Sequence, residues 1–257
     1  ARRVVSSAAT NPLDVNVWNE LERFVDSLPA GVFTLDPYER FLSEFMTRRG
    51  IPQAFSEMPR SLYIPSYDLD AGRRVVFGED APLGISVPRA IAASSAIPIL
   101  YAPVNYEGRD YVDGGIGDVA HVDIAAAKGC NLIVVVNPMV PVHAGGGGGR
   151  DVPTGHGPQR RVRDKGAIWV YEQAMRMRSE AGMRLRLDEF RSSHSQTDVV
   201  VLEPKQSDAT LFMYSPMNFA ARRAILEEGY TSTARLLSDA DSPLRQTLAK
   251  HGLNVVV

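Results

Sequence analysis

Apolar side chains recur every three or four positions in several segments, which is the period of a helix with one buried face. The first such segment covers residues 17–28, where Val17, Leu21 and Phe24 share one side and a proline follows. The helix after it begins with Asp36-Pro37, since aspartate is a common N-cap and proline fits the first turn. Together with local composition, this spacing predicts further helices over residues 88–96, 122–128, 164–192 and 218–237.

Strand signals lie between these helices. Two short apolar runs joined by turn residues predict a hairpin over residues 62–77, and a second hairpin over residues 105–112 leads to Asp113. Pro65 argues for an edge position or a local irregularity in the first hairpin. Residues 131–137 form a continuous run rich in valine, which is typical of a parallel strand buried on both faces. Another buried strand is expected at residues 199–202, and the alternation of strands and helices predicts a layered α/β fold.

Length and composition add limits to this picture. A chain of 257 residues with 44% apolar residues can form one large α/β domain or at most two small ones. We expect a single domain over residues 1–257. Within it, residues 138–163 are predicted to be a flexible loop, because Gly145 to Gly149 stand in a row and further glycines and prolines follow.

The charge, the cysteine content and the lengths of the apolar runs argue against a nucleic-acid partner, an internal disulfide and a membrane span. The net charge of −2 gives no sign of nucleic acid as a partner. The one cysteine, Cys130, excludes an internal disulfide, and we expect it to be a small buried apolar residue at the start of a strand. No apolar run approaches the roughly 18 residues that span a membrane. The compartment stays open, with the cytoplasm or a membrane surface favoured.

The strongest chemical signal is Asp113-Gly114-Gly115, directly after a short apolar strand. The two glycines place a carboxylate on a sharp turn where the backbone leaves room for another group to approach. Taken alone, an aspartate before glycine is also common in ordinary turns, where the carboxylate bonds its own backbone.

Four segments in order connect this turn to a known family. They are Ser66-Tyr67-Asp68-Leu69-Asp70-Ala71-Gly72, then Ala93 to Pro98, then Tyr111 to Gly115, and finally residues 208–230. In this order they resemble the patatin-like phospholipase family, the last of them resembling one bacterial subgroup. The resemblance implies a three-layer αβα domain with a mostly parallel central sheet.

The resemblance also implies a chemistry. Enzymes of this family hydrolyse lipid esters with a serine–aspartate dyad and need no cofactor. Carried over by position, Asp113 is the base that takes the proton of the serine hydroxyl, which is a poor nucleophile without such a base. Gly114 and Gly115 would let the two site loops approach each other. The partner is then a lipid or another ester substrate.

The nucleophile has no counterpart in this sequence. No G-x-S-x-G occurs, and the run Gly84-Ile85-Ser86-Val87-Pro88 has a proline where the second glycine should stand. The glycines at 145–149 fall after Asp113, whereas the family's oxyanion loop comes before the serine. Because the first residue is Ala1, we expect an N-terminal portion, or a second chain, to carry the oxyanion loop and the nucleophile.

Several alternatives stay open at this point. A protein that kept the fold and lost the nucleophile would be a catalytically inactive binding or scaffold subunit. His121 departs from the family's pattern after the aspartate, and it either caps the following helix or bonds the loop, or it tunes the site. The arginines and lysine between residues 160 and 186 form a solvated face or a peripheral contact with anionic lipid headgroups. His143 and His156 have no neighbouring ligands in the sequence, so we expect no metal site.

Overall fold

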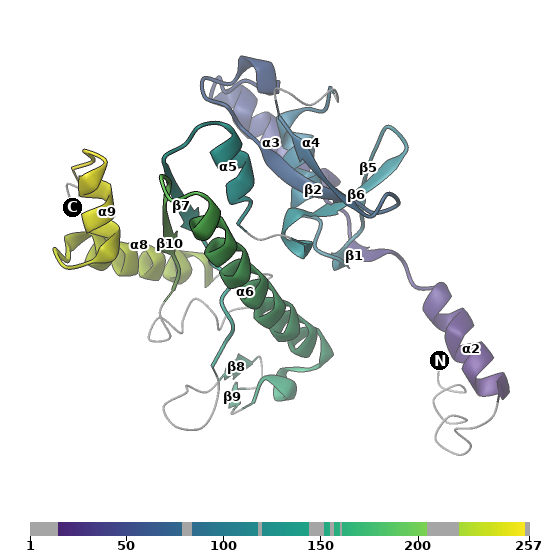
Figure 1. Cartoon of the computed structure of the whole chain (residues 1–257). Helices are drawn as coiled ribbons and strands as arrows, with labels where there is room; N and C mark the ends of the chain where they lie inside the picture. Colours follow the sequence, from purple (N-terminus) through teal and green to yellow (C-terminus); the bar gives the residue numbers. More distant parts are fainter. Residues whose placement is uncertain are drawn as a thin grey trace. The chain divides into compact units, whose positions relative to one another are not determined.

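The structure is a computed structural model (Figure 1), and it describes residues 15–78, 84–117, 120–143, 152–154, 157–159, 161–204 and 221–254. The chain divides into two compact units, Ala1–Gly114 and Gly115–Val257. Both contain helices and strands, and each has a pair of parallel strands, so the protein is of the α/β kind. A helix with the length and apolar character needed to cross a membrane is not found among the described residues.

The helices of the first unit follow the predicted segments. They are α2 (Val15–Asp26), α3 (Asp36–Arg48) and α4 (Val87–Ser94), with a single 3-10 turn, η1 (Phe55–Glu57). At the start of α3, the Thr34 hydroxyl accepts a hydrogen bond from the Asp36 N–H at 3.2 Å and donates to its carboxylate at 2.8 Å. Asp36 is therefore the first helical residue rather than the cap, and Pro37 lies in the first turn as predicted.

The strands of the first unit form two sheets. The larger is antiparallel, has the order β3-β2-β6-β5, and consists of β2 (Ile64–Asp68), β3 (Arg73–Phe77), β5 (Val104–Tyr106) and β6 (Arg109–Asp113). Both predicted hairpins, β2–β3 and β5–β6, are confirmed. The smaller sheet pairs β1 (Gly31–Phe33) with β4 (Ile99–Tyr101) in parallel.

Strand β2 lies in the interior of its sheet, so the edge position suggested by Pro65 is wrong. Pro65 pairs with Val76 of β3, and the ladder between β2 and β6 begins only at Ser66. At Pro65 the strand is therefore paired on one side. A proline is tolerated there because its missing N–H interrupts no bond to β6.

The core of the first unit lies between the larger sheet and α4. Phe77 and Tyr111 are almost fully buried, and their rings meet edge to face with centroids 5.2 Å apart. Ala90 and Ala93 of α4 have no exposed surface, and α4 contacts both β2 and β6. Their small side chains let this helix lie close against the sheet.

The second unit contains one parallel pair of strands and four helices among its described residues. The strands are β7 (Leu132–Val136) and β10 (Asp198–Leu202), paired in register from Asp198 opposite Leu132 to Leu202 opposite Val136. The helices are α5 (Val122–Ala127), α6 (Ala167–Ser193), α8 (Arg222–Ser238) and α9 (Pro243–Lys250). The parallel pairing agrees with the α/β prediction.

Only one face of β7 is buried, which corrects the prediction of a strand buried on both faces. Ile133 and Val135 pack against Met183 and Leu187 of α6 in one core cluster. On the opposite face, Val134 is 43% exposed and Val136 is 69% exposed. The apolar run could not reveal this difference, because burial depends on which other elements cover each face.

The segment 138–163, predicted to be a flexible loop, is described in part. Its beginning is tied to α6, since Gln173 donates to the carbonyl of Val142 at 2.7 Å and accepts from its N–H at 3.0 Å. Further along, β8 (Val152–Thr154) and β9 (Gly157–Gln159) form a small antiparallel hairpin, which the 3-10 turn η3 (Val162–Lys165) follows. The glycine run 145–149 and His156 lie outside the described residues, and His143 is exposed.

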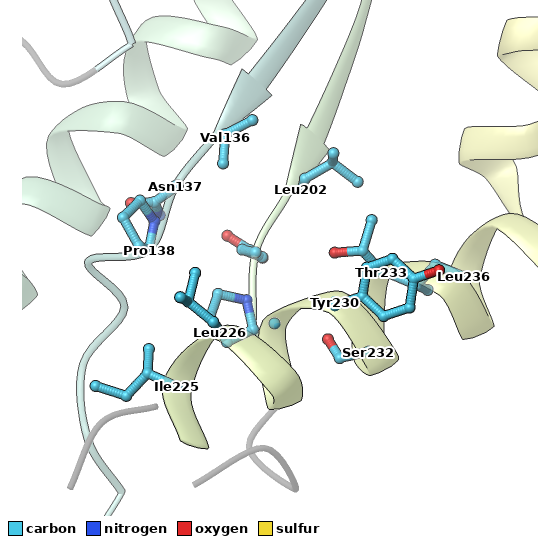
Figure 2. Close-up of a pocket in the computed structure, with 13 residues that line it drawn as sticks. Val136, Asn137, Pro138, Leu202, Ile225, Leu226, Tyr230, Ser232, Thr233 and Leu236 are labelled. Atoms are coloured by element: carbon cyan, nitrogen blue, oxygen red, sulfur yellow. The ribbon is translucent and has the colours of Figure 1, made fainter. Parts of the chain in front are cut away.

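A cavity of about 390 Å³ lies in the second unit at the carboxyl ends of β7 and β10. Figure 2 shows Val136 and Leu202 at the two strand ends, with Leu226 and Tyr230 on α8 across from them. Parallel strands of α/β proteins commonly place their ligand sites at this end.

One arginine of the predicted basic stretch, Arg176, is not part of a solvated face, whereas Arg184 is exposed. Arg176 is buried, donates to the carbonyl of Val140 at 3.3 Å, and burial lowers its pKa. Arg184 is paired with Glu203. Cys130 also departs from expectation, because it is exposed in the turn before β7 instead of being buried.

Candidate functional site

Asp113 is the last residue of β6, and a short 3-10 turn, η2 (Gly114–Ile116), follows it directly. The aspartate is partly buried. Its backbone N–H donates to the carbonyl of Ala96 at 3.1 Å. The strand therefore ends at a turn, as the sequence predicted. The hydrogen bond to Ala96, which follows α4, fixes the position of this strand end.

The fold brings together three of the four segments that carried the family resemblance. Asp113 is opposite Ser66 of β2 in the antiparallel register, and Ala96 belongs to the segment that closes α4. These contacts join positions that are 17 to 47 residues apart in the chain. The fourth segment, residues 208–230, lies largely outside the described residues, which resume at residue 221 within it.

Gly114 is required by a close approach of backbone to backbone. A Cβ atom at this position would lie 2.3 Å from the carbonyl oxygen of Pro65, far inside a normal contact distance. The sequence predicted glycines that allow a close approach, and the neighbour that approaches is strand β2. Gly115, the first residue of the second unit, is exposed.

Ser66 is the serine directly opposite Asp113, but its hydroxyl is already engaged. It has no exposed surface, and its Oγ donates to the carbonyl of Val112 at 2.6 Å. A hydroxyl that is buried in the sheet and hydrogen-bonded to the backbone cannot contact an ester substrate. Ser66 is therefore structural.

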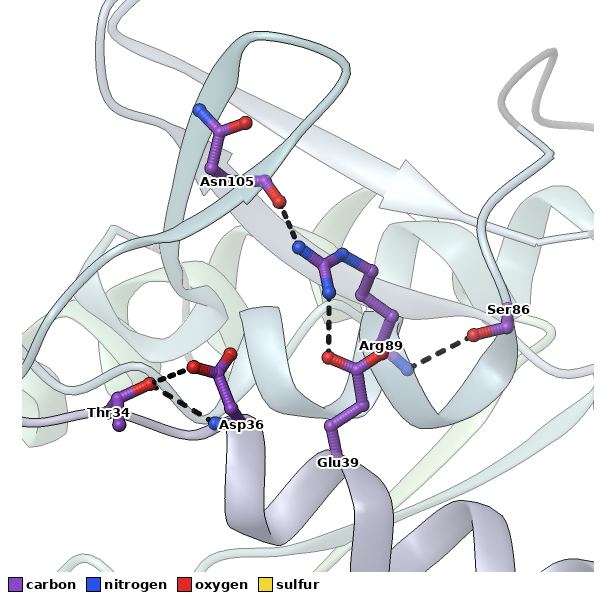
Figure 3. Close-up of polar contacts among 6 residues, drawn as sticks. All are labelled: Thr34, Asp36, Glu39, Ser86, Arg89 and Asn105. Atoms are coloured by element: carbon purple, nitrogen blue, oxygen red, sulfur yellow. Dashed lines mark hydrogen bonds and ion pairs between the residues drawn. The ribbon is translucent and has the colours of Figure 1, made fainter.

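Ser86, from the imperfect serine elbow, is also structural. It is the N-cap of α4, and its Oγ accepts a hydrogen bond from the N–H of Arg89 at 3.4 Å. The Arg89 side chain forms an ion pair with Glu39 of α3 at 2.8 Å and donates to the carbonyl of Asn105 (Figure 3). These contacts fasten α3 and α4 to β5, an edge strand of the sheet that carries Asp113.

Asp68 is a buried carboxylate whose role the sequence did not reveal. One oxygen accepts from the N–H of Ala71 at 2.9 Å, and the other accepts from Arg109 of β6 at 2.8 Å. These two bonds lower the pKa of Asp68 below its usual value, the bond to Ala71 contributing most. Because Arg109 begins the strand that ends at Asp113, this pair positions β6. No local pattern in the sequence signalled this pair, because the pairing of β2 with β6 is a long-range contact that neither hairpin fixes.

His121 immediately precedes α5 in the second unit. Its backbone is left-handed, with φ of 43°, and its side chain makes no N-cap hydrogen bond. His121 therefore occupies the N-cap position without a side-chain cap, and the two other interpretations, that it bonds the loop or that it tunes the site, stay predictions. Among the described residues, no three histidine, cysteine, aspartate or glutamate side chains gather to hold a metal ion.

The fold and the candidate site together describe an α/β protein in which an aspartate, Asp113, ends a sheet strand and is followed by a glycine turn. Residues 8–126 match the family model of patatin-like phospholipases, which confirms the resemblance over this range. A comparison with curated proteins gave no match. The matched range includes Asp113, Gly114, Gly115 and His121, and this family domain suggests the hydrolysis of lipids.

Proposed function

We propose that this protein is a lipid acyl hydrolase in which Asp113 is the base of a serine–aspartate dyad. The serine is supplied by residues that are not in this sequence, either an N-terminal portion or a second chain. The observation that carries the proposal is the position of Asp113 on a glycine turn within the range that matches the patatin-like phospholipase family.

In the proposed reaction, Asp113 takes the proton of the serine hydroxyl while the serine oxygen attacks the carbonyl carbon of the lipid ester. The leaving alcohol receives that proton, and an acyl-serine remains. Water then attacks the acyl-serine while Asp113 accepts its proton, the fatty acid leaves, and Asp113 returns that proton to the serine oxygen. Every step uses side chains and water, so the reaction needs no cofactor.

We further propose that residues 1–257 belong to one three-layer αβα domain with a mostly parallel central sheet, completed by the portion that carries the serine. Parallel sheets in α/β proteins are normally covered on both faces. The exposed valines on one face of β7 support a further covering layer. A structure of the full-length protein in which Val134 and Val136 remain exposed to solvent would contradict this arrangement.

The test is the substitution Asp113→Asn in the full-length protein, with hydrolysis of a p-nitrophenyl ester as the measurement. The amide keeps the size of the side chain and cannot accept the serine proton, so we expect a loss of about 10²–10⁴-fold in kcat. Asp110→Asn is the matched control, because Asp110 lies on the same strand and its carboxylate accepts only from Asn105 in the contacts that the structure gives. Activity of Asp113→Asn within a few-fold of wild type would exclude Asp113 as the base.

The absence of a G-x-S-x-G motif from the sequence favours a second candidate, a catalytically inactive binding or scaffold subunit. A fluorophosphonate probe distinguishes the two, because it labels only an activated serine. Labelling of the full-length protein, reduced in Asp113→Asn and retained in Asp110→Asn, would support the hydrolase. A full-length protein that is not labelled, and whose intact mass is close to 28.1 kDa, would support the inactive subunit.

A further inference from the structure

Two arginines of α6 line a second, smaller cavity in the second unit. This cavity has a volume of about 150 Å³, and Arg178 and Arg186 line it together with Ser179 of the same helix. Ile116 and Gly117, at the end of the glycine turn, complete the opposite wall. Cavities that hold a whole drug-sized ligand measure about 300–1,000 Å³, so this one fits a single compact group of a ligand.

The two arginines of this cavity differ from the other three arginines of α6. Each of those three lies within ion-pair distance of an acidic residue on the same helix, and the pairs are Arg176–Glu172, Arg184–Glu180 and Arg191–Asp188. Arg178 and Arg186 are exposed and form no ion pair with any described residue. None of the described lining residues is acidic. The cavity therefore presents two positive charges that no carboxylate offsets.

Gly182 separates the two arginines and leaves the space between them open. Residues 178, 182 and 186 are spaced four apart, so they share one side of the helix. The Cα atoms of the two arginines are about 12 Å apart along the helix axis, from a rise of about 1.5 Å per residue. A Cβ atom at Gly182 would meet nothing within 4 Å. Both long side chains can therefore reach one anionic group held above this glycine.

We propose that this cavity binds a terminal phosphate group, a phosphate monoester, between Arg178 and Arg186. The planar guanidinium group of arginine donates two parallel hydrogen bonds to phosphate oxygens, and Ser179 adds a hydroxyl donor. A phosphate monoester carries nearly two negative charges at neutral pH, which matches the two arginines. A phosphodiester carries one negative charge and binds more weakly.

This inference does not depend on the proposed hydrolase activity. Arg178 and Arg186 lie outside residues 8–126, which match the patatin-like phospholipase family. The phosphate ligand is bound and is not cleaved, so its binding is measured in the same way in an active or an inactive protein.

The first experiment compares glycerol 3-phosphate with its methyl diester by titration calorimetry of the 257-residue protein, at pH 8 and constant ionic strength. We expect the monoester to bind about tenfold more tightly, because it makes charge-assisted hydrogen bonds to both arginines. Equal binding of the two compounds, or no binding of glycerol 3-phosphate, would overturn the proposal.

The second experiment replaces the arginines one at a time. Arg178→Gln and Arg186→Gln should each weaken the binding of glycerol 3-phosphate about tenfold or more, the effect of losing a hydrogen bond to a charged group. Arg235→Gln is the matched control, because Arg235 is an exposed arginine of α8 that lines neither of the two cavities. It removes the same charge from the same unit, and we expect binding to stay within about twofold. Equal losses in all three variants would show that only net charge matters and would refute the site.

A glycine substitution tests whether the anion lies between the arginines. Gly182→Leu fills the space above the helix, and leucine favours a helix more than glycine does, so we expect the unit to stay folded while binding is lost. Gly229→Leu is the control, because Gly229 lies within α8 with the same open space at its Cβ. Unchanged binding in Gly182→Leu, with circular dichroism confirming the fold, would contradict the assignment.

A phosphate monoester can belong to a soluble molecule or to the head group of a lipid, and octyl phosphate distinguishes the two sources. Leu185 lines the cavity and is 70% exposed, so an apolar chain beside the phosphate can contact it. Tighter binding of octyl phosphate than of glycerol 3-phosphate would support a phosphate carried by a lipid, and equal or weaker binding would support a soluble phosphate. In either case, binding of octyl phosphate that Arg178→Gln leaves unchanged would overturn the proposal.

Discussion

Gly114 is required by close backbone packing, and it also directly follows the candidate catalytic residue Asp113. The carbonyl of Pro65 occupies the space that a side chain would need, and Asp113 stands immediately before the glycine. The end of β6 is therefore held against β2 by direct backbone packing. The distance between these two strands therefore determines the position of the Asp113 side chain.

We predict that Gly114→Ala destabilises the first unit by about 1–3 kcal/mol, the usual cost of forcing extra volume into a packed site. The added methyl meets backbone atoms, which cannot move aside as a flexible side chain can. Denaturant unfolding of the protein, followed by tyrosine fluorescence, measures the change.

Gly84→Ala is the matched control for this substitution, because the nearest atom to a Cβ there is the Tyr106 hydroxyl oxygen at 4.0 Å. We expect its free energy of unfolding to stay close to that of the wild type. Similar losses in the two variants would show that the contact with Pro65 is not the cause.

At the scale of elements, the position of α4 depends on one arginine that joins three parts of the first unit. Arg89 pairs with Glu39 of α3 and donates to the carbonyl of Asn105 in β5. Both charged side chains are mostly shielded from water, which strengthens their attraction relative to that of an exposed pair. Since Ala96 at the end of α4 accepts from the N–H of Asp113, the placement of α4 affects the site as well.

Replacing Arg89 by methionine should therefore cost about 1.5–3 kcal/mol of unfolding free energy, the range for hydrogen bonds that involve a charged group. Methionine keeps the apolar stem and removes the donors. Chemical unfolding at neutral pH measures the loss. Arg48→Met is the control, because Arg48 and Glu44 form an exposed pair within α3 that should contribute less than about 1 kcal/mol. A loss for Arg89→Met no larger than that for Arg48→Met would refute the role of this pair.

At the scale of the whole molecule, the described part of each unit contains an aspartate whose charged form is stabilised by hydrogen bonds. In the first unit Asp68 is bonded by Ala71 and Arg109, and in the second Asp198 is bonded by Lys250 and His251. These bonds lower the pKa of both aspartates from the ordinary value of 3.8. Both pairs join segments distant in sequence, so their loss weakens the tertiary structure of each unit.

The sign of the pH dependence follows from linkage. A carboxyl group with a lowered pKa in the folded state contributes stability that is fully present above its unfolded pKa and is lost as the pH falls through the folded value. We therefore predict that both units lose stability as the pH falls below about 4. Asp68→Asn should flatten this acid dependence in the first unit alone, and Asp198→Asn in the second alone. Hydrogen exchange followed by mass spectrometry, read separately for each unit, checks this, and a dependence unchanged in both variants would disprove the assignment.

Much of the secondary structure could be predicted because it depends on neighbours in the chain. The spacing of apolar residues indicated α2, α3, α6 and both hairpins, and the position of Asp113 at a strand end followed from a run of a few residues. The order of short motifs was likewise sufficient for the resemblance that the family match over residues 8–126 supports.

Other features depend on parts of the chain that meet only after folding. The exposure of Val136, the burial of Arg176 and the pairing of Asp68 with Arg109 each involve elements far apart in sequence. Local spacing carries no information about which element covers a given face, because that choice is made by long-range packing. For the same reason, the sequence indicated a glycine turn at Asp113, whereas the folded chain revealed which backbone atom makes Gly114 necessary.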